Sequence, residues 1–214
     1  MEPYENRVEA GRYLAEMLAE YRDRDDVIVL ALPRGGVPVG LEVARRLHAP
    51  LDLMLVRKLG VPGHEELAMG AITSAARVLN DEVIVNCGIT EADLERETRA
   101  EQAELARRDR RYRGERPPPS LRDRCVILVD DGIATGATME AAARAVRALG
   151  PSLLVIAVPV AARSTIERFT HLADRIECPL QPVSFWAIGA WYRDFSQLSD
   201  DQVIAMMREA EQLS

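Results

Sequence analysis

A chain of 214 residues, 48% hydrophobic and 29% charged, is long enough for one domain with a buried core. Its net charge of -7 argues against a broad nucleic-acid or membrane surface, and no apolar run reaches the roughly 18 residues of a transmembrane helix. The N-terminus has no apolar signal core, and Cys87, Cys125 and Cys178 have no metal-type spacing, so we expect a cytoplasmic protein with reduced thiols.

Apolar periodicity divides the first part of the chain into alternating helices and strands. The spacing of Val8, Leu14 and Leu18 predicts an amphipathic helix near the N-terminus. In chain order we expect a helix over 6–22, a strand over 27–32, a helix over 37–47 and a strand over 51–56. Short strands and loops are expected over 59–88, with apolar stretches at 68–73 and 83–85.

A charged helix is predicted over residues 90–112. Thr90, with Asp93 three residues later, suits a helix start, and Glu–Arg pairs four residues apart support the helix. Its apolar stripe is thin, so we expect it to lie on the surface or to contact a partner subunit, which would make the protein a homodimer. Five arginines near its end either complement the helix dipole or contact phosphate: Arg107, Arg108, Arg110, Arg111 and Arg113.

The alternation continues after a stiff, proline-rich connector at 116–120. The elements predicted here are a strand over 125–129, a helix over 136–149, a strand over 153–158, a helix over 163–172, a short strand near 174–178 and a final helix over 200–212. Strands that alternate with helices predict an α/β fold, a doubly wound, mostly parallel sheet flanked by helices, in a single domain over 1–214. A ligand is then expected at the carboxyl ends of the strands.

The strongest functional signal lies in residues 125–139. An apolar strand ends in Asp130 and Asp131, and a turn containing Thr135 and Gly136 opens the next helix. Two adjacent carboxylates can accept hydrogen bonds from neighbouring sugar hydroxyls, and a helix N-terminus binds an anion. A solvated turn before an ordinary helix start is the simpler interpretation. The combination of both features favours a site for ribose 5-phosphate.

Two further strand ends carry positive charge. Arg34, Gly35 and Gly36 follow the first strand, where the arginine can hold an anion and the glycines allow close approach of the backbone. Arg57 and Lys58 end the second strand and would face the same edge of the sheet. The alternatives are an ordinary glycine turn and a solvated strand end.

These segments resemble the type I phosphoribosyltransferase family. The run Val-Asp-Asp-Gly-Ile-Ala-Thr-Gly-Ala-Thr-Met is most similar to the phosphoribosyl-pyrophosphate (PRPP) loop of adenine phosphoribosyltransferases. The resemblance implies that Asp130 and Asp131 hold the ribose hydroxyls and a Mg²⁺ ion. It also implies that the 5′-phosphate is bound by Ala134, Thr135, Gly136, Ala137 and Thr138. The patterns Arg-Lys-Leu-Gly-x-Pro-Gly and Trp-Tyr-x-Asp-Phe are similar to an uncharacterised bacterial branch of the family.

The resemblance also implies roles for the two cationic segments. Residues 34–36 match the family's pyrophosphate loop, where a strained peptide, here expected at Arg34–Gly35 or Gly35–Gly36, presents an N–H to pyrophosphate. Arg57 and Lys58 match the start of a flexible catalytic loop, which together with an insertion would span 59–119. Closure of that loop would exclude water from the reacting centre.

The chain departs from the hypoxanthine-guanine enzymes at Ala134, where those enzymes carry an aspartate that meets the purine. A general base must then come from elsewhere. Adenine enzymes use a glutamate of the flexible loop, which makes Glu65 or Glu66 candidates, and Glu66 is assigned as catalytic with Arg34, Arg57 and Lys58. His64 is a further acid–base candidate.

Aromatic side chains concentrate after the last predicted core strand. In the family this segment, here 179–198, is a hood that selects the nucleobase by stacking. Core packing is the usual alternative for such residues. Four side chains are candidates for the stacking role, with Trp191 the one assigned: Trp186, Trp191, Tyr192 and Phe195. The residues that remain, 199–214, would form the C-terminal helix.

The leading hypothesis is a Mg²⁺-dependent phosphoribosyltransferase that uses PRPP and a nitrogenous base and releases pyrophosphate. It would serve nucleotide salvage and bind neither nucleic acid nor membrane. Two alternatives stay open. The first is a PRPP-binding or nucleotide-binding regulator without transferase activity, and the second is a hydrolase of a phosphoribosyl compound.

Overall fold

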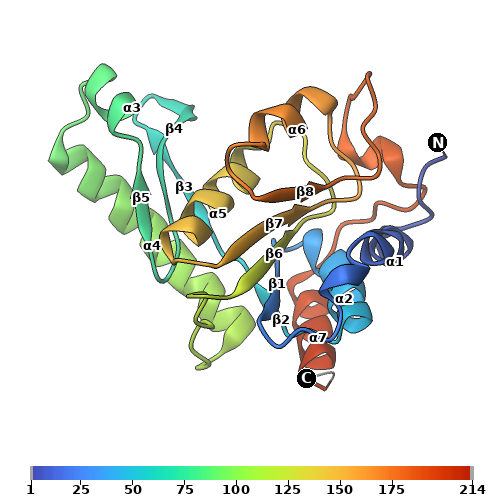
Figure 1. The fold of residues 1–214 in the computed structure, drawn as a ribbon. Helices are drawn as coiled ribbons and strands as arrows, with labels where there is room; N and C mark the ends of the chain where they lie inside the picture. Colours follow the sequence, from blue (N-terminus) through green and yellow to red (C-terminus); the bar gives the residue numbers. More distant parts are fainter. Residues whose placement is uncertain (1, 213–214) are drawn as a thin grey trace.

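The computed structural model describes residues 2–212, with only the backbone described at Glu66. It contains a five-stranded parallel sheet in the order β2-β1-β6-β7-β8 and a three-stranded antiparallel sheet in the order β3-β4-β5 (Figure 1). The predicted α/β fold with a mostly parallel sheet is therefore confirmed. The strands of the larger sheet are β1 (Val27–Ala31), β2 (Leu51–Leu53), β6 (Cys125–Val129), β7 (Leu153–Ala157) and β8 (Arg175–Glu177).

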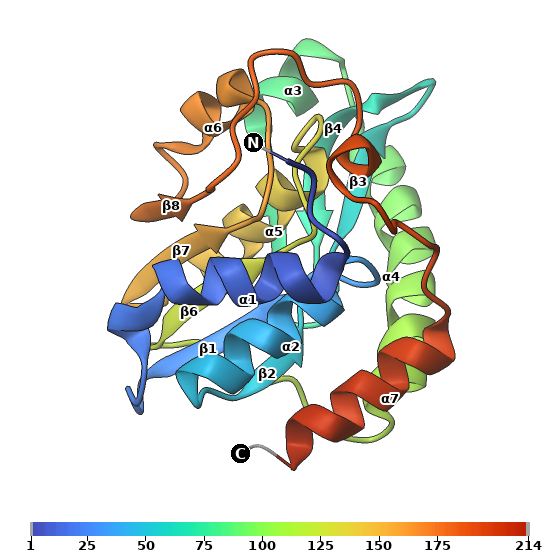
Figure 2. The same cartoon turned by 90° about the vertical axis from the view of Figure 1, so that its right-hand side faces the viewer.

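Helices cover both faces of the parallel sheet. Helices α1 (Arg7–Met17) and α2 (Gly36–Leu47) lie on one face, in front of the sheet in Figure 2. Helices α5 (Ala137–Ala148) and α6 (Arg163–Phe169) pack on the other. Alternate strand residues enter the two cores, so every residue of β1 and β6 is buried. Each large aliphatic side chain buried in this way contributes about 1.5–3 kcal/mol of transfer free energy.

The chain leaves the parallel sheet after β2 and builds a separate layer. That layer consists of β3 (Arg57–Val61), β4 (His64–Ile72), β5 (Arg77–Leu79), α3 (Asp81–Asn86) and α4 (Glu91–Arg113). The predicted second strand was too long, since β2 ends at Leu53. The prediction of short strands and loops was also wrong for residues 83–85, which lie in the helix α3. The Asn80 side chain accepts a hydrogen bond from the Val83 amide and so caps the start of this helix.

The charged helix α4 begins as predicted, with a reciprocal capping box between Thr90 and Asp93. Its thin apolar stripe is covered by the chain itself, since Leu94, Leu105 and Tyr112 are buried in one core with β3 and β4. The last helix, α7 (Asp200–Glu211), contributes to the same core and also contacts α2 and β2. The C-terminal helix therefore bridges the parallel sheet and the inserted layer.

A buried arginine fastens the end of α4 to the edge of the parallel sheet. Arg113 donates to the Asp52 carboxylate at 3.0 Å and to the Leu53 carbonyl at 2.6 Å, both in β2. It also forms an ion pair with Asp109 one turn earlier in α4. Of the arginine cluster predicted at this helix end, Arg113 thus has a structural role.

The order of the strands creates a switch point between β1 and β6. From β1 the chain continues through α2 to β2 on one side, and from β6 it continues through α5 to β7 on the other. The helices α2 and α5 that follow these strands therefore lie on opposite faces of the sheet. Open α/β sheets bind ligands at the carboxyl edge beside such a point. Among residues 2–212, none of the helices is both long and apolar enough to cross a bilayer.

Candidate functional site

Two loops meet at the switch point. Because β1 and β6 pair in register with Ala31 opposite Val129, the segments 32–36 and 130–136 leave the sheet side by side. A Cβ added to Gly35 would lie 2.0 Å from Oδ2 of Asp131. A Cβ at Gly36 would lie 2.8 Å from the Val129 carbonyl oxygen. Both glycines are therefore required for the close approach of the two loops.

The loop after β1 contains a cis peptide bond that does not precede a proline, between Pro33 and Arg34. A strained peptide at Arg34–Gly35 or Gly35–Gly36 stays a prediction. Non-proline cis bonds are too rare for a sequence signal to locate them. The Gly36 amide donates to the Leu32 carbonyl at 3.0 Å, so it is already used within the protein.

The carboxylates after β6 have different surroundings. Oδ2 of Asp131 accepts a hydrogen bond from Arg7 Nε at 2.8 Å, while Oδ1 of Asp130 accepts one from the Asp131 amide at 2.8 Å. Burial raises the pKa of Asp130 well above its usual range, and the neighbouring Asp131 raises it further. Burial also raises the pKa of Asp131, which the Arg7 guanidinium opposes. A cation that arrives with a ligand would relieve this repulsion.

The N-terminus of α5 follows directly from the turn predicted to bind an anion. In the described part of the chain no side chain caps the helix, and the backbone enters it through Gly136 at φ +85°. A Cβ there would lie 2.7 Å from the Phe169 ring, so both the conformation and the contact favour glycine. Thr165 Oγ1 donates to the Ala134 carbonyl at 3.1 Å and holds the turn in place. The amides of the first turn, with exposed residues at 135, 137 and 138, remain directed outward.

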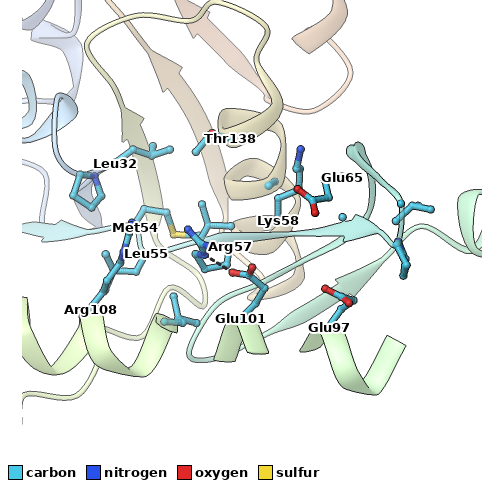
Figure 3. A pocket seen from close by; sticks show the side chains of 18 residues that line it. Leu32, Met54, Leu55, Arg57, Lys58, Glu65, Glu97, Glu101, Arg108 and Thr138 are labelled. Carbon is cyan, nitrogen blue, oxygen red and sulfur yellow. Dashed lines mark hydrogen bonds and ion pairs between the residues drawn. The ribbon is translucent and has the colours of Figure 1, made fainter. Parts of the chain in front are cut away.

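A cavity of about 740 Å³ opens between this helix end and the inserted layer (Figure 3). Arg57, Lys58 and Thr138 line it together with the α4 side chains of Glu97 and Glu101. The Arg57 guanidinium forms an ion pair with Glu101, drawn as a dashed line in Figure 3. The two adjacent cations expected at this edge thus reach the same cavity as the α5 N-terminus, although they lie in β3 rather than at the end of β2.

The side chain of Arg34, predicted to be catalytic, is directed toward Asp200 in α7 and is not among the residues that line the cavity. Its Nη1 lies 3.8 Å from Oδ1 of Asp200 in α7, and its side chain is half exposed. Asp200 also accepts from the Tyr112 hydroxyl at 2.6 Å and pairs with Arg111 at 3.0 Å. Arg34 therefore sits where the loop after β1 meets α4 and α7.

Comparison with known proteins identifies the family. The sequence pattern of the Phosphoribosyl transferase domain family matches residues 4–191. The chain belongs to this family. The resemblance carried by residues 125–139 is thereby confirmed.

Two relatives and one solved structure show how far this phosphoribosyl transferase domain extends. Proteins of Mycobacterium tuberculosis strains CDC 1551 / Oshkosh and ATCC 25618 / H37Rv, provisionally named phosphoribosyl transferases, are each 46% identical over 211 residues. The matches cover 98% of this chain but 47% of the relatives, so the domain spans about half of their length. The crystal structure of TT1426 from Thermus thermophilus superposes with a TM-score of 0.89 at 42% identity, covering 98% of this chain and 99% of that chain.

Two of the aromatic candidates in the phosphoribosyl transferase domain are packing residues. Tyr192 is buried and its hydroxyl donates to the Asp131 carbonyl at 2.6 Å, and Phe195 stacks on it with ring centroids 5.1 Å apart. Trp191 is half-buried and lines a shallow cavity of about 520 Å³ together with Arg163 and Gln181. Trp186 is 92% exposed. Stacking on a ligand thus remains open to the two tryptophans but not to Tyr192.

The glutamates considered as bases lie in β4. Glu65 lines the 740 Å³ cavity. The side chain of Glu66 lies outside the described part of the chain, so its assignment stays a prediction. Sequence reasoning missed Arg7, which reaches the site of the phosphoribosyl transferase domain from 124 residues away and had been read only as part of an amphipathic helix.

Proposed function

We propose that the protein transfers the 5-phosphoribosyl group of PRPP to a nitrogenous base and releases pyrophosphate, a reaction that suits nucleotide salvage. One observation carries the proposal. The uncapped N-terminus of α5 and the carboxylates of Asp130 and Asp131 lie on one loop at the switch point of the sheet. Phosphate and vicinal hydroxyls occur side by side in ribose 5-phosphate, and the cations Arg57 and Lys58 nearby supply a site for pyrophosphate.

Each part of PRPP then has a place in the proposal. The 5′-phosphate binds the amides and hydroxyls of residues 134–138. Asp130 and Asp131 accept hydrogen bonds from the ribose 2′- and 3′-hydroxyls. Lys58 and the Gly35 backbone contact pyrophosphate, with Arg57 and Arg34 joining them after leaving their carboxylate partners. Trp191 is a candidate to contact the base.

The donor set fits Mg²⁺. Within residues 2–212 no cluster of three or more metal-binding side chains forms a self-sufficient site. Mg²⁺ needs no such cluster, because it is usually held by one or two carboxylates, water and substrate phosphates. Asp130 and Asp131 would hold it, and when bound it neutralises charge on the pyrophosphate oxygens.

The chain's own groups act mainly by position and charge. As the C1–O bond breaks, negative charge grows on the pyrophosphate oxygens, where Lys58 and Arg57 stabilise it. A base nitrogen then forms the new bond to C1. Residues of β3 and β4 line the cavity, and in the proposal they keep water from competing for that carbon. Glu66 would accept a proton from a base that must lose one.

The proposal is tested by measuring the release of pyrophosphate from PRPP. The assay is run without a base and with each member of a panel of purines, pyrimidines and other nitrogen heterocycles. Base-dependent release with formation of the matching nucleotide is expected. Base-independent release would identify a hydrolase instead. No release with any base, despite tight PRPP binding, would identify a regulator. The Asp130→Asn, Asp131→Asn double variant, purified in parallel, controls for contaminating activity.

Replacing Glu101 with glutamine is expected to tighten pyrophosphate binding. The carboxylate competes for Arg57, and a pair of this exposure contributes up to about 1 kcal/mol, which corresponds to roughly fivefold in affinity. Isothermal titration calorimetry with pyrophosphate measures the change. Glu95→Gln is the matched control, because Glu95 lies on the same helix and pairs with Arg99 on an exposed face. Weaker binding by Glu101→Gln would show that Glu101 orients Arg57 instead of competing for it.

A further inference from the structure

The Arg7–Asp131 pair joins the first residue of α1 to the loop after β6. Arg7 Nε and Asp131 Oδ2 are 2.8 Å apart, and the two side chains are only 12% and 10% exposed. An ion pair this well buried is costly to break, since the remaining charge loses its partner away from water. The contact therefore fixes the position of the Asp131 carboxylate.

The opposite end of the guanidinium is also held. Arg7 Nη1 donates to the Ser196 carbonyl at 3.0 Å, and the guanidinium carbon lies 3.9 Å from the centre of the Phe195 ring. A planar guanidinium can make an ion pair, a hydrogen bond and a stacking contact at once, which an ammonium group cannot. The segment after Trp191 thereby orients Arg7.

Asp131 is enclosed from two further directions. Its carbonyl accepts the Tyr192 hydroxyl at 2.6 Å, and its Oδ2 lies against the Cα of Gly35, where a Cβ would approach to 2.0 Å. The carboxylate thus sits between α1 and the loop after β1. The neighbouring Asp130 is held differently, since its Oδ1 accepts a hydrogen bond from the Asp131 backbone amide at 2.8 Å.

We propose that Arg7 is a positioning residue of the PRPP site, which holds Asp131 in its binding orientation without contacting the substrate. The proposal rests on the function proposed above. It assigns the N-terminal helix and the segment 195–196 a direct part in forming the ribose site. Arg7 acts through Asp131, so its removal should matter only while the Asp131 carboxylate is present.

A double-mutant cycle on PRPP affinity tests this dependence. Wild type, Arg7→Met, Asp131→Asn and the double variant are titrated with PRPP and Mg²⁺ in a calorimeter. Arg7→Met is expected to weaken binding about tenfold, and the double variant is expected to bind within about threefold of Asp131→Asn alone, because residues in contact are not additive. Single-variant factors that simply multiply would overturn the proposal.

Matched variants separate positioning from folding. Arg12→Met is the control, because Arg12 lies on the same helix and pairs at 2.9 Å with the buried Glu42, away from the site. Its PRPP affinity should equal that of wild type. Arg7→Lys keeps the charge and should recover part of the affinity lost in Arg7→Met. A purely structural role would lower the binding stoichiometry, which reports the folded fraction, and leave the affinity unchanged, so that result also overturns the proposal.

PRPP binding by the wild-type protein and by Arg7→Met separates the proposed function from the role of Arg7. Wild-type protein that does not bind PRPP removes the proposed function and, with it, this role of Arg7. Wild-type protein that binds PRPP, while Arg7→Met binds it equally well, removes only the positioning role.

Discussion

Asp130→Asn combined with Asp131→Asn is expected to abolish PRPP binding while the fold survives. Asparagine keeps the shape of aspartate but removes the negative charge that, in the proposed function, accepts hydrogen bonds from the ribose hydroxyls and attracts Mg²⁺. Losing both carboxylates should lower the affinity at least a thousandfold, equivalent to about 4 kcal/mol. The fold should survive because two stability effects oppose each other. Repulsion between the adjacent carboxylates disappears, whereas Arg7 loses its ion-pair partner.

Calorimetry with PRPP and circular dichroism on the same samples check this result. The charge-matched control is Asp25→Asn with Asp26→Asn, which alters another adjacent aspartate pair. Asp26 pairs with Arg24 at 2.8 Å in an exposed turn before β1. The control should bind PRPP as wild type does. Micromolar PRPP binding by the Asp130, Asp131 double variant would contradict the assigned ribose site.

Gly35→Ala is expected to lower PRPP affinity by about a hundredfold, or roughly 2.7 kcal/mol. The new Cβ would lie 2.0 Å from Oδ2 and 2.6 Å from Cγ of Asp131, far inside van der Waals contact. Asp131 cannot easily yield, because Arg7 and Tyr192 hold its side chain and its carbonyl. The loop after β1 must shift instead, which displaces the predicted pyrophosphate-binding backbone. The ribose hydroxyls and the pyrophosphate of PRPP would then both lose the groups proposed to bind them.

PRPP titration and urea unfolding together distinguish this effect from general destabilisation. Gly150→Ala is the comparison variant, because Gly150 has φ +71° and an added Cβ there would meet no atom of the described residues within 4 Å. It should cost about 1 kcal/mol of stability through backbone strain and leave PRPP affinity unchanged. Equal affinity in Gly35→Ala and wild type would mean that the two loops move apart without consequence for the ligand.

The sequence was enough to predict that Asp130 and Asp131 lie beside the N-terminus of α5, because the residues that determine this arrangement are close together in the chain. A buried strand runs directly into Asp130 and Asp131, and Gly136 precedes the next helix, so the order of residues fixes their arrangement. Arg7 could not be predicted in the same way. Its contact with Asp131 bridges 124 positions and depends on how α1 packs across the sheet.

In the inserted layer, the apolar pattern of the sequence predicted the wrong secondary structure at two places. Arg57 and Lys58 lie in β3 because the chain turns away from the parallel sheet after Leu53, and a continuous apolar run through 53–56 hides that turn. Residues 83–85 are apolar enough for a strand, yet the cap at Asn80 makes them helical. After Leu53 the tertiary packing outweighed the apolar pattern of the sequence, and at residues 83–85 the side-chain cap did so.

The fastening of Arg113 to β2 also bears on self-association. An edge strand presents unpaired carbonyl and amide groups, which can recruit a strand from another molecule. β2 is an edge strand only three residues long, and Arg113 occupies the Leu53 carbonyl while Asp52 carries a second charge to the same edge. At this edge, Arg113 of the inserted layer thus takes up a carbonyl group that a strand of another molecule would need for pairing. The same layer also forms one wall of the cavity.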